Sequence, residues 1–289
     1  MNKRSWIYPI LLIGCACLLL AGSYKGKTDQ SGTHLLKYDM AAGSKFLVTG
    51  KNFYERETVL PDGALTGNTI EHEAECLFEV KSIGSDQGLN LKMEFQKITC
   101  EKNNPGGTFH EAFSDLTGHA VDILLSPEGE FSGLEVFNNL PQKDVLLQLS
   151  DPSGFLHRAN NVFPHLPDHP VGPGDTWTFR LDRERPMMRG ARSKIISVHT
   201  YTLMEYTTKD GIPCAKIEAS FTQTSRTEIE GGRGPVVCEY SGKGEETILF
   251  AYEKGMFLSK QGYLDMEGSF GESPQTDRIE YTFITRFDR

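Results

Sequence analysis

The fold is decided by twelve residues that divide the chain into two similar parts: Leu166-Pro167-Asp168-His169-Pro170-Val171-Gly172-Pro173-Gly174-Asp175-Thr176-Trp177. Three of them are prolines, which have no N–H to donate to a helix or a sheet ladder, and two are glycines, which favour turns. The stretch is therefore predicted to be an extended connector. It ends at Trp177, where a new strand is expected to begin.

Strand patterns lie on both sides of this connector. Leu89, Leu91, Met93 and Phe95, for example, alternate with polar residues, which is the period-2 pattern of a strand with one wet face. About a dozen such strands joined by hairpins imply an antiparallel, all-β fold. A sheet of that length curls, splits or closes, because twist accumulates from strand to strand. We expect either two curved meander sheets or one large half-barrel.

The order of elements before the connector matches the order after it. Gly174-Asp175-Thr176-Trp177 corresponds in position to Gly43-Ser44-Lys45-Phe46, and each stretch precedes a long hairpin and then a second hairpin. The predicted hairpins cover residues 69–95 and 120–136 in the first half and 194–224 and 247–264 in the second, with polar loops at 101–118 and 226–244. The last predicted strand, 278–287, has no counterpart in the first half.

A short helix is predicted at 142–149, where Val145, Leu146 and Leu149 share helical spacing. It would pack between or over the two halves. The length of 289 residues allows one large β domain or two smaller ones. The predicted organisation is a signal peptide or membrane anchor at 1–23, a linker at 24–34, a first β repeat at 35–140, a helix and proline-rich connector at 141–170, and a second β repeat at 171–289.

The N-terminus has the features of an export signal. Asn2-Lys3-Arg4 is basic, and the apolar run from Trp6 to Ala21 follows it. Leu12-Ile13-Gly14-Cys15 resembles the bacterial lipobox, in which Cys15 would be lipidated. Cleavage after Ser23 and retention as an anchor are the alternatives, although the run is short against the roughly 20 residues that span a bilayer. Each fate places the protein in the periplasm or the cell envelope.

Four cysteines lie beyond the export signal. An even number in an oxidising compartment predicts up to two disulfides, with three possible connectivities. The chain contains no CxxC motif and no close Cys/His cluster, so a structural metal is disfavoured. The disulfide candidates are Cys76, Cys100, Cys214 and Cys238.

Charge and motifs exclude several functions. The formal net charge of −9 becomes −11 once residues 1–23, which contain Lys3 and Arg4, are removed. Such a surface repels phosphate backbones, so nucleic acid is not an expected partner. The sequence contains no GxSxG, SxxK, HExxH, Walker A or Rossmann fingerprint. We therefore expect no catalytic, cofactor-binding or metal residues, and assign Gly174, Asp175 and Trp177 to a structural anchor.

The connector pattern also carries a family resemblance. Leu166-Pro167-x-x-Pro170-Val171-x-x-Gly174-Asp175-Thr176-Trp177 resembles the signature of uncharacterised bacterial envelope proteins, often lipoproteins, that contain a domain of unknown function. The resemblance implies an exported β protein and brings no catalytic residues with it. More distantly, the expected architecture is similar to the curved half-barrels that carry lipoproteins or lipids through the periplasm.

Three functions remain open. The first is a non-catalytic envelope protein, attached to a membrane through its N-terminus, whose β surface binds another envelope component. The second is a carrier that holds a lipid or another apolar ligand in its curved sheet. The third is a hydrolase whose site is dispersed along the sequence, since catalytic triads are spatial rather than sequential. A large apolar cavity would favour the carrier.

Overall fold

The computed structural model describes residues 32–60, 62–112, 114–132, 162–186, 192–231 and 234–287. These residues form an all-β, antiparallel fold with one short 3-10 turn, η1 (Ser114–Leu116), and include no helix long and apolar enough to cross a membrane. The strands are β1 (Lys45–Val59), β2 (Leu65–Ile83), β3 (Leu89–Asn104), β4 (Gly107–Ala112), β5 (Ala120–Leu125), β6 (Phe131–Ser132), β7 (Thr176–Pro186), β8 (Arg192–Lys209), β9 (Ile212–Gly231), β10 (Gly234–Ala251), β11 (Met256–Phe270) and β12 (Ser273–Phe287). The helix predicted at 142–149 and the export signal with Cys15 lie outside the described residues.

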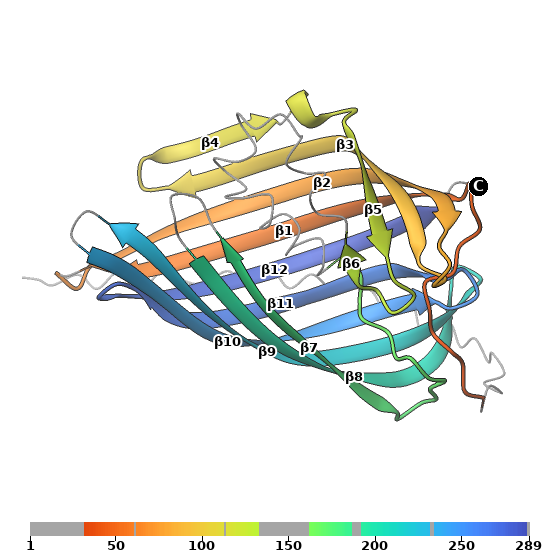
Figure 1. Ribbon diagram of the computed structural model, residues 1–289. Coiled ribbons are helices and arrows are strands. Elements are labelled where there is room, and N and C mark those ends of the chain that lie inside the picture. Colours follow the sequence, from red (N-terminus) through yellow and green to blue (C-terminus); the bar gives the residue numbers. More distant parts are fainter. Residues whose placement is uncertain are drawn as a thin grey trace, which may run out of the picture. The chain divides into compact units, whose positions relative to one another are not determined.

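All twelve strands belong to one open, curved sheet (Figure 1). Its order is β6-β5-β3-β2-β1-β12-β11-β10-β9-β8-β7, and β4 pairs with β3 beside this path. The predicted fold class is therefore confirmed, in the form of a single sheet rather than two. The strand without a counterpart, β12, joins the halves by pairing with β1.

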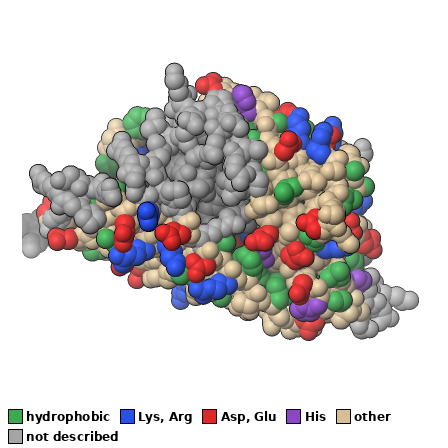
Figure 2. All heavy atoms as spheres, viewed as in Figure 1, with side chains coloured by type: hydrophobic (Ala, Val, Ile, Leu, Met, Phe, Trp, Pro, Cys, Tyr) green, Lys and Arg blue, Asp and Glu red, His purple; other side chains and the backbone are tan. Residues whose placement is uncertain are grey.

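Most strands have one buried face and one outer face. In β5, Val121, Ile123 and Leu125 are buried while Ala120, Asp122 and Leu124 are exposed. We call the buried side of the sheet the inner face and the opposite side the outer face. Charged side chains of both signs are interspersed over the side of the molecule seen in Figure 2.

Two stretches predicted to be loops are strands instead. Residues 101–118 contain the end of β3 and all of β4, and residues 226–244 contain the end of β9 and the start of β10. Most side chains in these stretches are exposed or half-buried. Polar residues therefore occupy both phases of the strand, and the period-2 pattern that identifies a strand disappears.

Phe163 lies at the centre of the core on the inner face. Its side chain is 1% exposed, and its ring contacts four other aromatic rings at centroid distances of 5.7–5.9 Å. These rings belong to Tyr38, Phe78, Phe131 and Phe257. Burial of each large apolar side chain stabilises the fold by about 1.5–3 kcal/mol. The inner face is thus packed at this end of the sheet.

Two non-strand segments, 34–40 and 163–171, supply part of this core. Leu36, Tyr38, Phe163 and Leu166 are buried in it. The segments are tied together by the isolated bridge between His34 and Val171. The Tyr38 hydroxyl also donates to the Pro164 carbonyl at 2.9 Å. The connector therefore continues the core rather than running free over the surface.

The first strands of the two halves start in the same way. Gly43 and Gly174 have positive φ angles of 85° and 92°, a region that glycine adopts without steric cost. Each start exchanges two backbone hydrogen bonds with the next strand: Gly43 N to Val80 O (2.7 Å) and Val80 N to Ser44 O (2.9 Å), and Gly174 N to Leu203 O (2.7 Å) and Leu203 N to Asp175 O (3.0 Å). The two predicted strand starts therefore correspond in backbone geometry. The repeat of the two halves and its boundaries stay a prediction.

Trp177 packs into the core directly after this start. Its side chain is 9% exposed, and its ring stacks on Tyr201 at a centroid distance of 5.4 Å. The indole N–H donates to the His165 carbonyl at 3.0 Å. Asp175 fixes the preceding turn, because its carboxylate accepts the Gly172 N–H at 2.8 Å. Trp177 thus holds the edge strand β7 to both β8 and the connector.

We expect Trp177→Ala to lower the free energy of unfolding by about 3–5 kcal/mol, because the substitution leaves a cavity and removes the hydrogen bond of the indole N–H. Denaturant unfolding of the purified protein measures it. Thr178→Ala, on the exposed face of the same strand, is the matched control and should change stability by no more than about 0.5 kcal/mol. A loss below about 1 kcal/mol for Trp177→Ala would contradict its role as an anchor.

Candidate functional site

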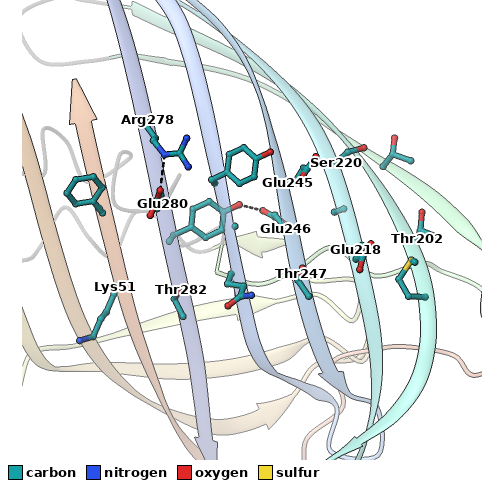
Figure 3. Close-up of a pocket in the computed structure, with 18 residues that line it drawn as sticks. Lys51, Thr202, Glu218, Ser220, Glu245, Glu246, Thr247, Arg278, Glu280 and Thr282 are labelled. Carbon is teal, nitrogen blue, oxygen red and sulfur yellow. Dashed lines mark hydrogen bonds and ion pairs between the residues drawn. The ribbon is translucent and has the colours of Figure 1, made fainter. Parts of the chain in front are cut away.

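An open groove of about 860 Å³ crosses the outer face from β8 to β1 (Figure 3). The strand registers explain its shape, because two adjacent rows of outward side chains run across six strands and form its walls. The Tyr263 row consists of Thr200, Ser220, Glu245, Tyr263, Glu280 and Phe53, and the Gln261 row consists of Thr202, Glu218, Thr247, Gln261, Thr282 and Lys51. We call this channel the outer groove.

The floor of the outer groove is the stretch of each strand between the two rows. Ala219, Glu246, Gly262 and Tyr281 occupy these intermediate positions. The side chains of Glu246 and Tyr281 are buried, so strand alternation turns them toward the inner face. Backbone groups of the floor are already used in the sheet ladders. A ligand in the groove would therefore be bound by the side chains of the walls.

Arg278 organises one end of the outer groove. Its guanidinium donates to Glu280 at 2.8 Å and to Asp265 at 3.1 Å. It also lies over the ring of Tyr263, 5.5 Å from the centroid. Exposed pairs of this kind contribute about 1 kcal/mol or less to stability. Their main effect is to fix the orientation of the Tyr263 ring and the Glu280 carboxylate.

A second groove of about 750 Å³ lies beside the first on the outer face. Its walls come from the next rows of β9 to β12 and β1, and Arg278 lines both grooves. Carboxylates outnumber basic groups along the walls. Glu55, Glu57, Glu218, Glu245, Asp265, Glu267 and Glu280 are the outward acids, and Lys51, Lys243 and Arg278 are the outward bases. This surface is therefore acidic overall.

A buried ion pair lies on the inner side of the outer groove's floor. Lys260 Nζ is 3.0 Å from Glu246 Oε1, and the two side chains are 2% and 1% exposed. The Tyr281 hydroxyl donates to the same Glu246 oxygen. Burial is the main cause that raises the pKa of Tyr281, and the Glu246 carboxylate raises it further. Removal of one member would leave the other charge uncompensated in the interior.

Gly262 makes this arrangement possible. It stands between Glu246 on β10 and Tyr281 on β12, because both face it across the sheet. A Cβ at this position would lie 2.8 Å from the Tyr281 hydroxyl oxygen, closer than atoms approach without a shift. Only glycine lets the tyrosine reach across β11 to Glu246. The hydrogen bond therefore ties three neighbouring strands together.

His199 and Ser197 lie on the inner face of β8. Ser197 Oγ is 3.2 Å from His199 Nε2, which is the distance expected of a nucleophile and its base. Within the described residues, however, His199 Nδ1 has no hydrogen-bond partner to orient the ring, and both residues are buried. Neither residue lines the two grooves. The geometry gives the dispersed hydrolase no support here.

The four cysteines that are the disulfide candidates lie on four different strands. Cys76, Cys100, Cys214 and Cys238 are all buried. Cys76 is opposite Phe95, whereas Cys100 is opposite His72, several residues further along the sheet. Cys214 and Cys238 are still further apart, since they pair with Thr207 and Thr227 on β8 and β9. The strand registers thus place neither Cys76 opposite Cys100 nor Cys214 opposite Cys238, and the disulfides stay a prediction.

The predicted anchor residues and the carboxylates of β2 do not meet in one site. Gly174, Asp175 and Trp177 start the edge strand β7, outside both grooves. Glu73 lies on the outer face of β2, between Lys51 at 3.3 Å and Lys97 at 3.1 Å. No cluster of three metal-ligating groups occurs within the residues that the structure describes.

Neither the outer groove nor the buried pair beneath it is among the features predicted from the sequence. The groove cannot be recognised in the sequence, since residues 51–53 meet residues 280–282 only through the pairing of β1 with β12. The buried pair, in contrast, could be predicted from the sequence around Glu246. Glu246 is in phase with Ile248 and Phe250, which are buried. A charged residue in the apolar phase of a strand indicates a buried, partnered charge.

Comparisons with known proteins identify no family for this chain. No family model matches it, and no curated protein matches it. A candidate exported protein with a YmcC-like fold from Bacteroides fragilis is 11% identical, over 89% of this chain and 100% of that chain, with a TM-score of 0.24. A candidate lipoprotein from Parabacteroides distasonis is also 11% identical, over 88% and 100%, with a TM-score of 0.24. Function must therefore be argued from the residues of this chain.

His199 gives a testable pH dependence. Burial lowers its pKa from 6.5 to about 4; Glu246 opposes this shift and Lys260 adds to it. Between about pH 4 and pH 6.5, the His199 side chain binds a proton in the unfolded chain but not in the folded protein. Stability is thus fully present above about pH 6.5 and falls by about 3 kcal/mol as the pH drops to about 4.

Urea unfolding at several pH values measures this loss against His199→Phe. The phenylalanine keeps the stacking on Tyr201 and Phe221, whose rings lie 5.9 and 4.6 Å from the His199 ring, and removes the titrating group. We expect a flatter stability profile for the variant between pH 4 and 6.5. Equal slopes for the two proteins would contradict the shifted pKa.

Proposed function

We propose that the protein is exported to the cell envelope, is held at a membrane through its N-terminal segment, and is a non-catalytic binding protein. The basic and apolar pattern of residues 1–23 supports export and attachment. The outer groove supports binding. Its volume of about 860 Å³ lies within the range of about 300–1,000 Å³ found for ligand sites.

The observation that carries the proposal is the composition of the groove's walls. Tyr263, Phe53 and Arg278 belong to the residue types enriched in protein interfaces. Met204, which lines the same groove, is 43% exposed. Hydroxyl and amide side chains between them, such as Gln261, provide hydrogen-bond donors and acceptors. The groove thus offers apolar and polar contacts on a rigid sheet.

Carriage of an apolar ligand is less well supported by the described residues. A carrier requires apolar surface beyond what packing consumes. On the inner face, the rings of Phe46, Phe78, Phe131 and Phe257 are buried in the core around Phe163. The two grooves on the outer face have charged and hydroxyl-bearing walls. The proposal therefore places binding on the outer face of the sheet.

Site-specific photo-crosslinking in living cells tests the proposal. A photoreactive amino acid at Thr247, in the wall of the outer groove, should give a discrete adduct when the full-length exported protein is irradiated. Asp122, an exposed residue of β5 outside both grooves, is the matched control position. The Thr247 adduct should disappear when Glu280→Lys reverses a charge in the opposite wall.

Equal adducts from Thr247 and Asp122 would show contact without specificity and would count against the groove. No adduct from Thr247, with the protein correctly exported, would contradict the proposal.

A further inference from the structure

We propose that the outer groove binds a proline-rich, basic segment of a partner protein in the polyproline II conformation. The inference rests on the proposed function, because it names the occupant of the same groove. Its starting point is the order of residue types in the Tyr263 row. Glu245, Tyr263, Glu280 and Phe53 follow one another on β10, β11, β12 and β1, and Glu71 on β2 lies next to Phe53 beyond the end of the row, so that carboxylates and aromatic rings alternate.

The spacing of the two rings selects the conformation of the ligand. Tyr263 and Phe53 both face Glu280, from opposite sides, and are therefore two strand spacings, about 9.4–9.8 Å, apart. A polyproline II chain repeats every three residues, or about 9.3 Å. It would present equivalent residues to both rings. An extended β-strand repeats every two residues, about 6.4–6.8 Å, and falls out of step between them.

The floor of the groove also disfavours a β-strand ligand. A strand binds by adding to a free sheet edge, where backbone groups are unpaired. The groove instead crosses the middle of the sheet, and β9 to β12 and β1 are each paired on both sides. A polyproline II chain needs no hydrogen bonds to a sheet edge, since its backbone groups form hydrogen bonds with solvent or with side chains. Gln261 stands in the wall as a donor to its carbonyls.

Aromatic walls suit proline for a second reason. Proline-rich segments dock into aromatic-lined grooves because their backbone is already ordered before binding. Tyr263 and Phe53 are both partly exposed. Arg278, stacked over Tyr263, holds one ring in place. Such preordering on both sides reduces the entropy lost on binding.

Charge sets the remaining chemistry of the occupant. Glu245, Glu280 and Glu71 flank the two rings and are exposed. The seven outward acids and three outward bases along the two grooves make the surrounding surface acidic. Lysine or arginine between the prolines would meet these carboxylates, and an acidic segment would be repelled. The occupant is therefore proline-rich and basic.

Fluorescence polarisation with the purified protein tests this occupant. The probe is a labelled peptide of repeated Pro-Pro-Arg units, long enough to span six strands. A peptide of repeated Gly-Ser-Arg units with the same length and charge is the matched control, and a neutral chitin oligosaccharide is the competitor. We expect the proline peptide to bind at least about tenfold more tightly than the glycine-serine peptide.

Variants locate the binding. Tyr263→Ala and Phe53→Ala should each weaken binding of the proline peptide about tenfold, because each substitution removes an aromatic ring that anchors the peptide. Phe109→Ala is the matched control, because Phe109 is an exposed ring on β4 outside both grooves. It should leave the affinity unchanged. Thermal unfolding of each variant verifies that the fold is retained.

Three results would overturn the inference. Equal affinity for the two peptides would mean charge attraction alone, and displacement by the oligosaccharide would mean a glycan site. Absence of peptide binding, with the Thr247 adduct still formed in cells, would reject the proline-rich occupant while leaving the binding groove in place. Absence of both would reject the inference together with the proposed function.

Discussion

The pairing of β1 with β12 is the interaction on which the rest of the structure depends. It runs from Phe46 opposite Phe287 to Thr58 opposite Gln275 and joins the first strand of the chain to the last. Without it, β1 and β12 would be the free edges of two separate sheets. The outer groove would not exist, because its walls cross this seam where Phe53 meets Glu280 and Lys51 meets Thr282.

Buried charge reinforces the seam on the inner face. Arg56 and Asp277 lie directly opposite each other and form two hydrogen bonds of 2.7 Å. The Asp277 side chain is 3% exposed, so its charge needs this partner. Arg56 also lies over the rings of Tyr54 and Tyr240. The inner face thus supplies stability, and the outer face contains the two grooves.

The same separation explains why the sheet can serve as a rigid platform. The Glu246–Lys260 pair and the Tyr281 hydrogen bond tie β10, β11 and β12 together just below the groove's floor. Rows of side chains on the outer face therefore keep a fixed spacing. Tyr263 and Phe53 are proposed to recognise a ligand by the distance over which its backbone repeats. Such recognition requires the fixed spacing of the rows.

Much of the fold could be predicted from the sequence, because strands and their starts are marked by patterns of neighbouring residues. Alternation identifies strands such as β5, and the glycines at 43 and 174 mark where each half begins. The predictions fail where local patterns carry no information. The polar ends of β3 and β9 have no apolar phase, so their sequences predict loops. The seam and the groove depend on which strands become neighbours, which alternation within one strand does not reveal.

Native-state amide hydrogen exchange distinguishes an interior seam between β1 and β12 from two free sheet edges. In an interior seam, successive amides of β1 and β12, including those of Lys51, Phe53, Tyr281 and Thr282, are all protected and open only with global unfolding. Fast exchange of every second amide along β1 or β12, as at a free sheet edge, would contradict it.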